Sequence, residues 1–404
     1  MTSWRNVLMP VAMTFATDGR VRREGGALAR HGFCVQALSW DRQGLRPSTE
    51  SVDHCLVRNI GFGKTSALPY SRLYYALAAV FFQAGIFLWA VNRIRKAHEL
   101  ILHSHDFNTL LGCVAAKRVL KNRVLLVYDC HELTPGVYQE WYGSFIAAIV
   151  ARLEFSALRE VDAIITANEA IRRYLQRASN APSVVVHNCP SVDDVPKLGL
   201  MDAKKKCDLQ DSFVVLFTGK VRQDYDFSMI LDAARDLRQK RMSGFKFVFV
   251  GLSELMAPLV KTVIDEGLQD FFDFRGYVSN EDWLAYYVAS DLCFAVTRDL
   301  GPNSRILTPN KIFESMACGV PVVVREGTLS AEIVRSLRCG IVLDAGHTSL
   351  SAELIRLSQN REMLHALGAA GRRAFRLRYN WDAMQNRLLQ LYAEILIPRP
   401  PQGK

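Results

Sequence analysis

The chain has 404 residues, half of them apolar, which is enough for two domains of roughly 200 residues and excludes a disordered or fibrous protein. Its net charge of +10 is uneven, because residues 1–200 contain 23 Lys and Arg against 16 Asp and Glu, whereas the remainder contains 27 against 24. The bias favours an anionic partner such as a phosphate ligand or an acidic membrane surface, and the lack of a dense basic run with interleaved aromatic residues argues against nucleic acid.

Nine cysteines are scattered along the chain without a Cys-x-x-Cys pair. Several lie in apolar stretches, where cysteine behaves as a small core residue, so the pattern favours a reducing compartment and argues against a structural zinc site. The first twenty residues hold no apolar stretch long enough for a secretory signal peptide. We expect a cytoplasmic protein, and a peripheral position on the inner face of the membrane stays open.

The first predicted domain covers residues 1–192 and alternates short apolar strands with longer amphipathic helices. Such alternation predicts an α/β domain with a parallel sheet covered by helices. After an initial strand in VLMPVAM, the expected elements are helix 20–31, strand 32–40, helix 72–95, strand 99–106, helix 108–119, strand 123–129, helix 141–160, strand 162–167, helix 168–177 and strand 183–188.

Residues 74–91 (YYALAAVFFQAGIFLWAV) form an apolar segment flanked by Arg72, Arg93 and Arg95. Its length is at the lower limit for a bilayer span. Three interpretations stay open: a helix of the first domain that is buried or faces a membrane, a true span, and an oligomer contact. The aromatic and basic edges suit a helix lying on a membrane.

Residues 189–211 lose periodicity and accumulate Pro, Asp, Gly and Lys, which is typical of a linker. The second domain, residues 208–380, shows the same alternation of short strands and amphipathic helices. This pattern predicts a second Rossmann-like sheet. A long amphipathic helix at 381–397 is expected to pack back onto the first domain. The predicted fold is therefore two Rossmann-like domains facing an interdomain cleft.

Residues 308–324 (TPNKIFESMACGVPVVV) predict a helix followed by a buried strand. Thr308 is the expected N-cap and Pro309 the first helical residue. Asn310 and Glu314, four residues apart, share a face that is expected to look into the cleft. A diphosphate at the helix start would meet free N–H groups and Lys311, and Glu314 would accept hydrogen bonds from ribose hydroxyls.

FTGKVRQDYD, after the first strand of the second domain, is a second phosphate-binding candidate. Gly219 permits close backbone approach, and Lys220 and Arg222 supply cationic donors. Neither a G-x-G-x-x-G nor a P-loop motif is present, which argues against nicotinamide, flavin and P-loop nucleotide sites.

Two neighbouring strands of the first domain end in His and Asp residues. Asp129 and His131 alternate along one strand and should point the same way, and His105 ends the other strand. Without a third well-spaced ligand set, contacts to a hydroxylated substrate fit better than a metal site. Asp18 and Gly19 should lie beside the cleft, after the first strand.

These motifs resemble the GT-B glycosyltransferases of family 4, the group 1 glycosyl transferases. DGRVRREGGALARHGFCV, LHSHDFNTLLG, VYDCHEL and VVVHNCP are similar to the family's first half; VVLFTGKV, FVFVG, FRGYVSNEDWLAYYVASDLCF and PNKIFESMACGVPVVV are similar to its second half. The resemblance implies transfer of a hexose-type sugar, with retention, from a nucleoside-diphosphate donor to a saccharide or lipid-linked saccharide in cell-surface polysaccharide or glycolipid synthesis. It implies no cofactor and no metal.

By this resemblance, Glu314 binds the donor ribose, Lys220 binds the phosphate, His131 contacts the donor sugar near the reacting carbon, and Gly19 lies near the diphosphate. The family's first motif glutamate is replaced by Ile306. Its second lysine is replaced by Tyr225 or Asp226, with Arg222 or Lys311 as substitutes. These departures leave the donor sugar and the stereochemistry open, and they keep two alternatives: a non-catalytic nucleotide-sugar-binding member of the fold and a nucleotide-sugar epimerase.

Overall fold

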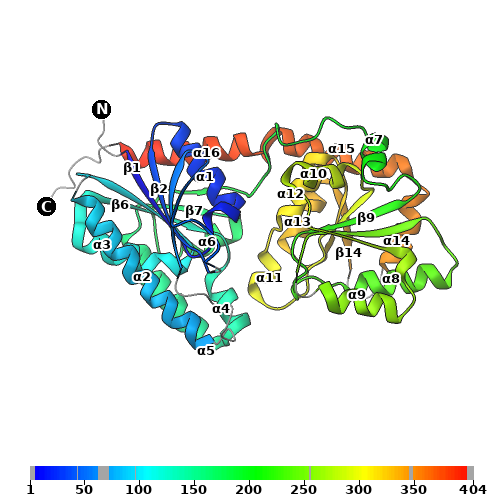
Figure 1. Cartoon of the computed structure of the whole chain (residues 1–404), viewed down its shortest axis with the longest axis horizontal. Coiled ribbons are helices and arrows are strands. Elements are labelled where there is room, and N and C mark those ends of the chain that lie inside the picture. Colours follow the sequence, from blue (N-terminus) through cyan, green and yellow to red (C-terminus); the bar gives the residue numbers. More distant parts are fainter. Residues whose placement is uncertain are drawn as a thin grey trace. The chain divides into compact units, whose positions relative to one another are not determined.

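The computed structural model describes residues 5–42, 44–61, 72–95, 97–253, 256–344 and 349–397. They form two compact units, one comprising the chain to Asn188 together with the chain from Met384, and the other comprising Cys189–Ala383 (Figure 1). We call them unit 1 and unit 2. Each is built on a sheet that is parallel or nearly so, which confirms the predicted pair of Rossmann-like domains.

Unit 1 contains an eight-stranded sheet in the order β3-β4-β2-β1-β5-β6-β7-β8, in which only β3 and β4 pair antiparallel. The strands are β1 (Asn6–Val11), β2 (Cys34–Trp40), β3 (Thr49–Val52), β4 (Cys55–Ile60), β5 (Leu100–His105), β6 (Val124–Cys130), β7 (Ala163–Thr166) and β8 (Ser183–Val185). Sequence analysis did not predict β3 and β4; β3 is a four-residue edge strand with no buried residue, and β4 lies between β3 and β2. The strand order reverses between β1 and β5, and ligands bind at such switch points in open α/β sheets.

The helices of unit 1 cover this sheet. They are α1 (Gly19–Arg30), α2 (Arg72–Ile94), α3 (Phe107–Leu120), α4 (Thr134–Tyr142), α5 (Ser144–Ala157), α6 (Glu169–Leu175) and most of α16 (Trp381–Leu396). The helix predicted over 141–160 corresponds to α5 but begins later than expected, because Gly143 adopts φ +85° and separates it from α4, which was not predicted. Helix α16 packs on unit 1, where Tyr392 is buried against His103.

Helix α2 covers most of the apolar segment that the sequence singled out. Phe82, Ile86 and Ala90 are buried, whereas Phe81 and Leu88 are 65 % and 64 % exposed. The helix therefore packs on unit 1 along one face, against α3. Among the described residues, no helix combines the length and the apolar character that crossing a bilayer requires.

Unit 2 contains a six-stranded parallel sheet in the order β11-β10-β9-β12-β13-β14. Its strands are β9 (Phe213–Thr218), β10 (Phe245–Val250), β11 (Phe272–Gly276), β12 (Leu292–Phe294), β13 (Val322–Arg325) and β14 (Gly340–Leu343). Its helices are α7 (Leu200–Lys206), α8 (Ser228–Gln239), α9 (Met256–Asp265), α10 (Asn280–Val288), α11 (Pro302–Ile306), α12 (Asn310–Cys318), α13 (Leu329–Leu337), α14 (Leu350–Ser358) and α15 (Arg361–Arg378). The switch point lies between β9 and β12.

Helix α12 begins one residue later than predicted. Pro309 is the N-cap and keeps an extended ψ of 140°, so Thr308 does not cap the helix. The predicted apolar face is confirmed, because Ile312, Phe313 and Met316 are each at most 1 % exposed.

Helix α7 lies in the stretch that the sequence predicts as linker, and a buried ion pair attaches it to unit 2. Lys204 Nζ lies 2.6 Å from Asp291 Oδ2, which also accepts a hydrogen bond of 2.8 Å from the backbone N–H of Val214. Arg361 on α15 pairs with the other carboxylate oxygen. Asp291 thus joins α7, β9 and α15.

We expect Asp291→Ala to lower the free energy of unfolding by about 3–5 kcal/mol, because the buried Lys204 ammonium loses its counter-charge. Urea denaturation of the whole chain would measure the loss. The matched control is Asp232→Ala, which removes a 70 % exposed carboxylate from an ion pair with Arg235 and should have little effect. Similar losses in both variants would contradict the role given to Asp291.

Candidate functional site

The first cluster of candidate residues lies at the switch point of unit 1, where α1 follows β1. Asp18 is the N-cap of α1, and its side chain accepts hydrogen bonds from the backbone N–H groups of Arg20 (3.0 Å) and Val21 (3.1 Å). Gly19 is the first residue of the helix and is exposed. The cap directs Arg20 into the unit, where it is 3 % exposed.

Asp129, at the end of β6, is the centre of this cluster. Arg20 binds it in a bidentate manner, with Nε 3.0 Å from Oδ2 and Nη2 2.6 Å from Oδ1. His105 Nδ1 and His131 Nε2 lie 3.2 Å and 2.7 Å from Oδ2. Asp129 is fully buried, so it has no surface with which to meet a substrate hydroxyl. Its geometry suits orientation of His131 rather than the substrate contact that the sequence suggested.

His131 is half-buried, with 16 % of its side chain exposed. Its backbone N–H donates to Asp106 Oδ1 (2.9 Å), and its Nδ1 lies 3.3 Å from Asp106 Oδ2. Burial opposes a charged ring, but the Asp106 and Asp129 carboxylates outweigh it and raise the pKa of His131 to about 10. The side chain is therefore an imidazolium at neutral pH, and because its Nε2–H is directed at Asp129, it offers an anionic or hydroxyl oxygen its positive charge rather than a free Nε2–H.

The neighbouring ionisable groups are held in complementary states. Burial together with the charges of His103 and His131 lowers the pKa of His105 to about 3, so this buried ring is neutral. Burial would raise the pKa of Asp129, but Arg20 and His131 outweigh it and hold that pKa well below its usual range. The result is one half-buried cation on a buried carboxylate, with neutral His105 beside it.

Asp106, directly after β5, has an unusual backbone. Its φ of +60° and ψ of 168° are strained for a residue other than glycine. The strained position places its carboxylate against both the backbone and the ring of His131. The strained backbone therefore holds the Asp106 carboxylate next to the His131 imidazole, where it is the second negative charge beside Asp129.

Glu24, His103, His105 and Asp129 place four potential metal-ligating atoms within 4.8 Å of one another. Arg20 Nη2, however, lies 3.2 Å from Glu24 and 2.6 Å from Asp129. A metal ion would add positive charge where a guanidinium already neutralises both carboxylates. The arrangement fits an ion-pair network better than a metal site, and the expectation of a metal-free protein stays a prediction.

The second cluster lies at the switch point of unit 2, in the turn after β9. Gly219 adopts φ +93°, and a β-carbon there would lie 3.7 Å from Lys311 Nζ. At the end of β10, Gly251 contacts the same turn so closely that a β-carbon would lie 2.4 Å from the Gly219 carbonyl oxygen. The bare backbone of this turn thus lies beside a lysine that comes from α12, about ninety residues further along the chain.

Lys311 is 8 % exposed and is held by aromatic rings. Its Nζ donates to Tyr225 Oη (2.8 Å) and lies 4.2 Å and 4.5 Å from the ring centres of Tyr225 and Phe217. Cation–π contacts of this kind stabilise the ammonium without neutralising it. Tyr225, which stands near the position of the family's second lysine, therefore holds a lysine from another element.

Glu314 lies one turn after Lys311 and is half-buried. Tyr287 Oη donates a hydrogen bond of 2.5 Å to Glu314 Oε2, and it also lies 2.7 Å from Thr218 Oγ1 at the end of β9. Burial and the Glu314 charge raise the pKa of Tyr287 well above its usual value, so the hydroxyl remains a donor. These bonds orient Glu314 and leave Oε1 without a hydrogen bond to the described residues.

The other predicted residues of unit 2 are on the surface. Lys220 is exposed and forms no ion pair within the described part of the chain, whereas Arg222 is exposed and lies 3.2 Å from Asp224. Asn310 is exposed at the start of α12, where the first backbone N–H groups of a helix have no intrahelical acceptor.

Sequence analysis did not single out several residues that organise these clusters. They are Arg20, Glu24, Asp106, Tyr287 and Tyr392. Arg20 lies 109 residues from Asp129 in the sequence, and Tyr287 lies 27 residues from Glu314. Local patterns carry no signal for such pairs.

Two family models match the chain and together cover most of it. The Glycosyl transferase 4-like domain matches residues 19–189, and Glycosyl transferases group 1 matches residues 202–374. The chain therefore belongs to the family 4, or group 1, glycosyl transferases, and the predicted family is confirmed. No curated protein sequence matched significantly.

Solved structures show the same fold at low sequence identity. Sucrose-phosphate synthase from Thermosynechococcus elongatus matches with a TM-score of 0.76 and 17 % identity, over 97 % of this chain and 99 % of that chain. Anabaena HepE in complex with UDP and glucose matches with a TM-score of 0.71 and 14 % identity, over 96 % and 100 %. The E. coli trehalose-6-phosphate protein bound with UDP-2-fluoro glucose matches with a TM-score of 0.69 and 8 % identity, over 98 % and 100 %. These likenesses confirm the GT-B fold.

We expect the His131 ring to titrate near pH 10, and Asp129→Asn to lower that pKa because one of its two stabilising charges is lost. Since the folded-state pKa lies above the ordinary value of 6.5, the charged ring stabilises the fold fully below about pH 6.5. That contribution is lost as the pH rises toward about 10. NMR titration of labelled imidazoles would measure both effects.

The control for this titration is Asp162→Asn, which alters an acid just before β7 that binds Lys117 and the Leu126 backbone rather than His131. It should leave the His131 titration in place. An ordinary pKa for His131 in the unaltered protein would contradict the assigned ion-pair network.

Proposed function

We propose that the protein transfers a hexose-type sugar from a nucleoside-diphosphate donor to a saccharide or lipid-linked saccharide, in the synthesis of a cell-surface polysaccharide or glycolipid. The observation that carries the proposal is the meeting of Gly219, Lys311 and Glu314 at the switch point of unit 2. Three features that suit a nucleotide sugar meet there: bare backbone from the turn after β9, and a buried cation and an oriented carboxylate that both come from α12.

The donor diphosphate is proposed to bind at the turn after β9. The backbone at Gly219 allows close approach, Lys311 and Lys220 supply positive charge, and the start of α12 supplies N–H groups. The free oxygen of Glu314 is proposed to accept from the donor ribose. UDP and UDP-2-fluoro glucose, named with two of the solved structures of this fold, support a nucleotide-sugar donor.

Catalysis is proposed to depend on stabilising the departing diphosphate rather than on a strong protein nucleophile. Lys220, Lys311 and Arg222 are assigned to this charge, and no cofactor or metal is assigned. The His131 imidazolium is assigned to a hydroxyl of the donor sugar near the reacting carbon, and the transfer is proposed to retain configuration. Ile306, in place of the family's first glutamate, removes one expected contact to that sugar.

A membrane-bound acceptor is supported by an unusual surface of unit 1. We call it the α5 surface; it consists of the exposed apolar residues Trp141, Tyr142, Phe145, Ile146, Ile149 and Leu153. Arg152, also exposed, lies among them, and Glu154 points inward and is buried. A helix with an outward apolar stripe and a basic residue suits insertion at an anionic membrane surface.

We expect Lys220→Ala to reduce sugar transfer by a factor of roughly 10²–10³ at saturating donor, because charge on the leaving group would lose one stabilising contact. A nucleotide-release assay with candidate donors and acceptors would measure it. Lys261→Ala, on α9, removes an exposed lysine that pairs with Asp265 and should leave transfer unchanged.

Two outcomes of this assay would favour the alternatives. Binding of nucleoside diphosphate without turnover for every donor and acceptor would indicate a non-catalytic protein. Product formation from the donor alone would indicate an epimerase.

We expect the double substitution Phe145→Ser, Ile149→Ser to reduce co-sedimentation with anionic vesicles, because it removes apolar area from the α5 surface. Leu377→Ser, on α15 of unit 2, removes a 76 % exposed leucine and is the matched control. Equal binding by all three proteins would contradict a membrane role for this surface.

A further inference from the structure

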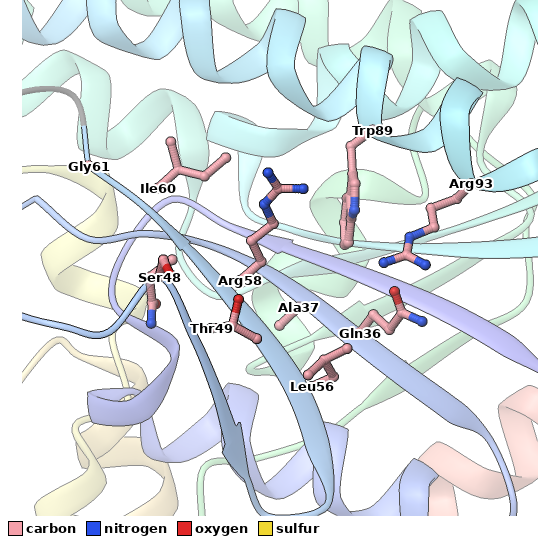
Figure 2. Close-up of a pocket in the computed structure, with 11 residues that line it drawn as sticks. Gln36, Ala37, Ser48, Thr49, Leu56, Arg58, Ile60, Gly61, Trp89 and Arg93 are labelled. Carbon is pink, nitrogen blue, oxygen red and sulfur yellow. The ribbon is translucent and has the colours of Figure 1, made fainter.

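A cavity of about 500 Å³ lies in unit 1 between the β2–β4–β3 edge of the sheet and the C-terminal part of α2 (Figure 2). It is separate from the His131 cluster, because β2 and β1 lie between β4 and β5 in the sheet. Its volume lies within the range of roughly 300–1,000 Å³ that is usual for small-molecule sites. None of the functions assigned above uses it.

Two arginines from different elements face this cavity. Figure 2 shows Arg58 extending from β4 toward α2, while Trp89 and Arg93 extend from α2 toward the sheet, above Gln36. Neither arginine forms an ion pair with any residue that the structure describes. No carboxylate is found among the described residues that line the cavity. The cavity therefore carries uncompensated positive charge from two guanidinium groups.

The lining also contains polar atoms that have no hydrogen-bond partner among the described residues. They are Trp89 Nε1, Gln36 Oε1 and Asn59 Oδ1, all buried. The Asn59 amide is fixed, because its Nδ2 donates to Pro47 O (2.8 Å) and Glu50 Oε1 (2.7 Å). The Asn59 Oδ1 is therefore an acceptor without a donor among the described residues. Buried polar atoms are normally paired, so three unpaired atoms around one cavity point to a ligand.

We propose that this cavity, which we call the Arg58–Arg93 pocket, binds a phosphate ester that carries hydroxyl groups. The two guanidinium groups and the Trp89 N–H would donate to the phosphate oxygens, and the amide oxygens of Gln36 and Asn59 would accept from hydroxyls. Such a ligand has two sources, a phospholipid headgroup or a soluble sugar phosphate. Exposed Leu88, on the same helix, would adjoin the acyl chains of a lipid.

The Arg58–Arg93 pocket goes beyond the proposed sugar transfer and does not depend on it. It lies in unit 1, whereas the residues assigned to the donor nucleotide lie in unit 2. Loss of the pocket should therefore leave binding of a nucleoside diphosphate in place, and Lys220→Ala should leave the pocket in place. The two proposals can fail separately.

The test is calorimetric titration of the whole chain with sn-glycerol 3-phosphate and with glucose 1-phosphate, and flotation with phosphatidylglycerol vesicles. Arg58→Gln and Arg93→Gln should each weaken binding by a factor of about 10 or more, because each removes a charge-assisted contact to phosphate. Trp89→Phe keeps the ring and removes the N–H, so it should weaken binding by a smaller factor. Glycerol without phosphate should not bind.

The control variant is Arg95→Gln, which removes the same charge just after α2 from an exposed residue outside the cavity lining. It should bind as the unaltered protein does. Binding of the soluble esters supports a free sugar phosphate as ligand, and binding of vesicles alone supports a headgroup. Absence of binding to all probes, or equal weakening by Arg95→Gln and the pocket variants, would overturn the proposal. Unchanged melting temperatures would show that the variants fold.

Discussion

The organisation of unit 1 depends on the buried carboxylate of Asp129. A carboxylate without exposure is costly unless it is paired, and here Arg20, His105 and His131 all bind it. These partners come from the start of α1 and the ends of β5 and β6, so one charge fixes three connections of the sheet at its switch point. Asp106 and this same charge keep the half-buried His131 protonated. The Asp129 side chain therefore both holds these elements together and affects the charge of His131.

Unit 2 also contains a buried charged side chain, but aromatic rings rather than an opposite charge stabilise it. Its cation, Lys311, is buried against Tyr225 and Phe217 and has no carboxylate partner in the described chain. An ammonium held in this way keeps its full charge for an anionic ligand, whereas an ammonium in an ion pair would be largely neutralised. Glu314 is oriented by Tyr287, a neutral donor, rather than by a cation. Aromatic and phenolic neighbours thus position both groups without cancelling them.

The departures from the family pattern have a structural explanation in one case and none in the other. Tyr225 stands near the expected position of a lysine, and the structure brings the Lys311 ammonium to its hydroxyl. A lysine ammonium is therefore present beside this residue, although it comes from another element. For Ile306, at the end of α11, the described residues offer no such explanation.

The sequence by itself determined the element types, the two Rossmann-like sheets and the family, because periodicity and short motifs are local properties. It also placed His131 and Lys220 just after strand ends, where ligands of such folds bind, and Glu314 one turn into a helix. It did not reveal that Asp129 is inaccessible, that Lys311 is packed between rings, or that Arg58 and Arg93 face one cavity. Burial and pairing depend on residues far apart in the chain, such as Arg20 with Asp129 and Tyr225 with Lys311. Only the tertiary structure brings those partners together. It therefore decides which charged groups are paired within the fold and which remain available to a ligand.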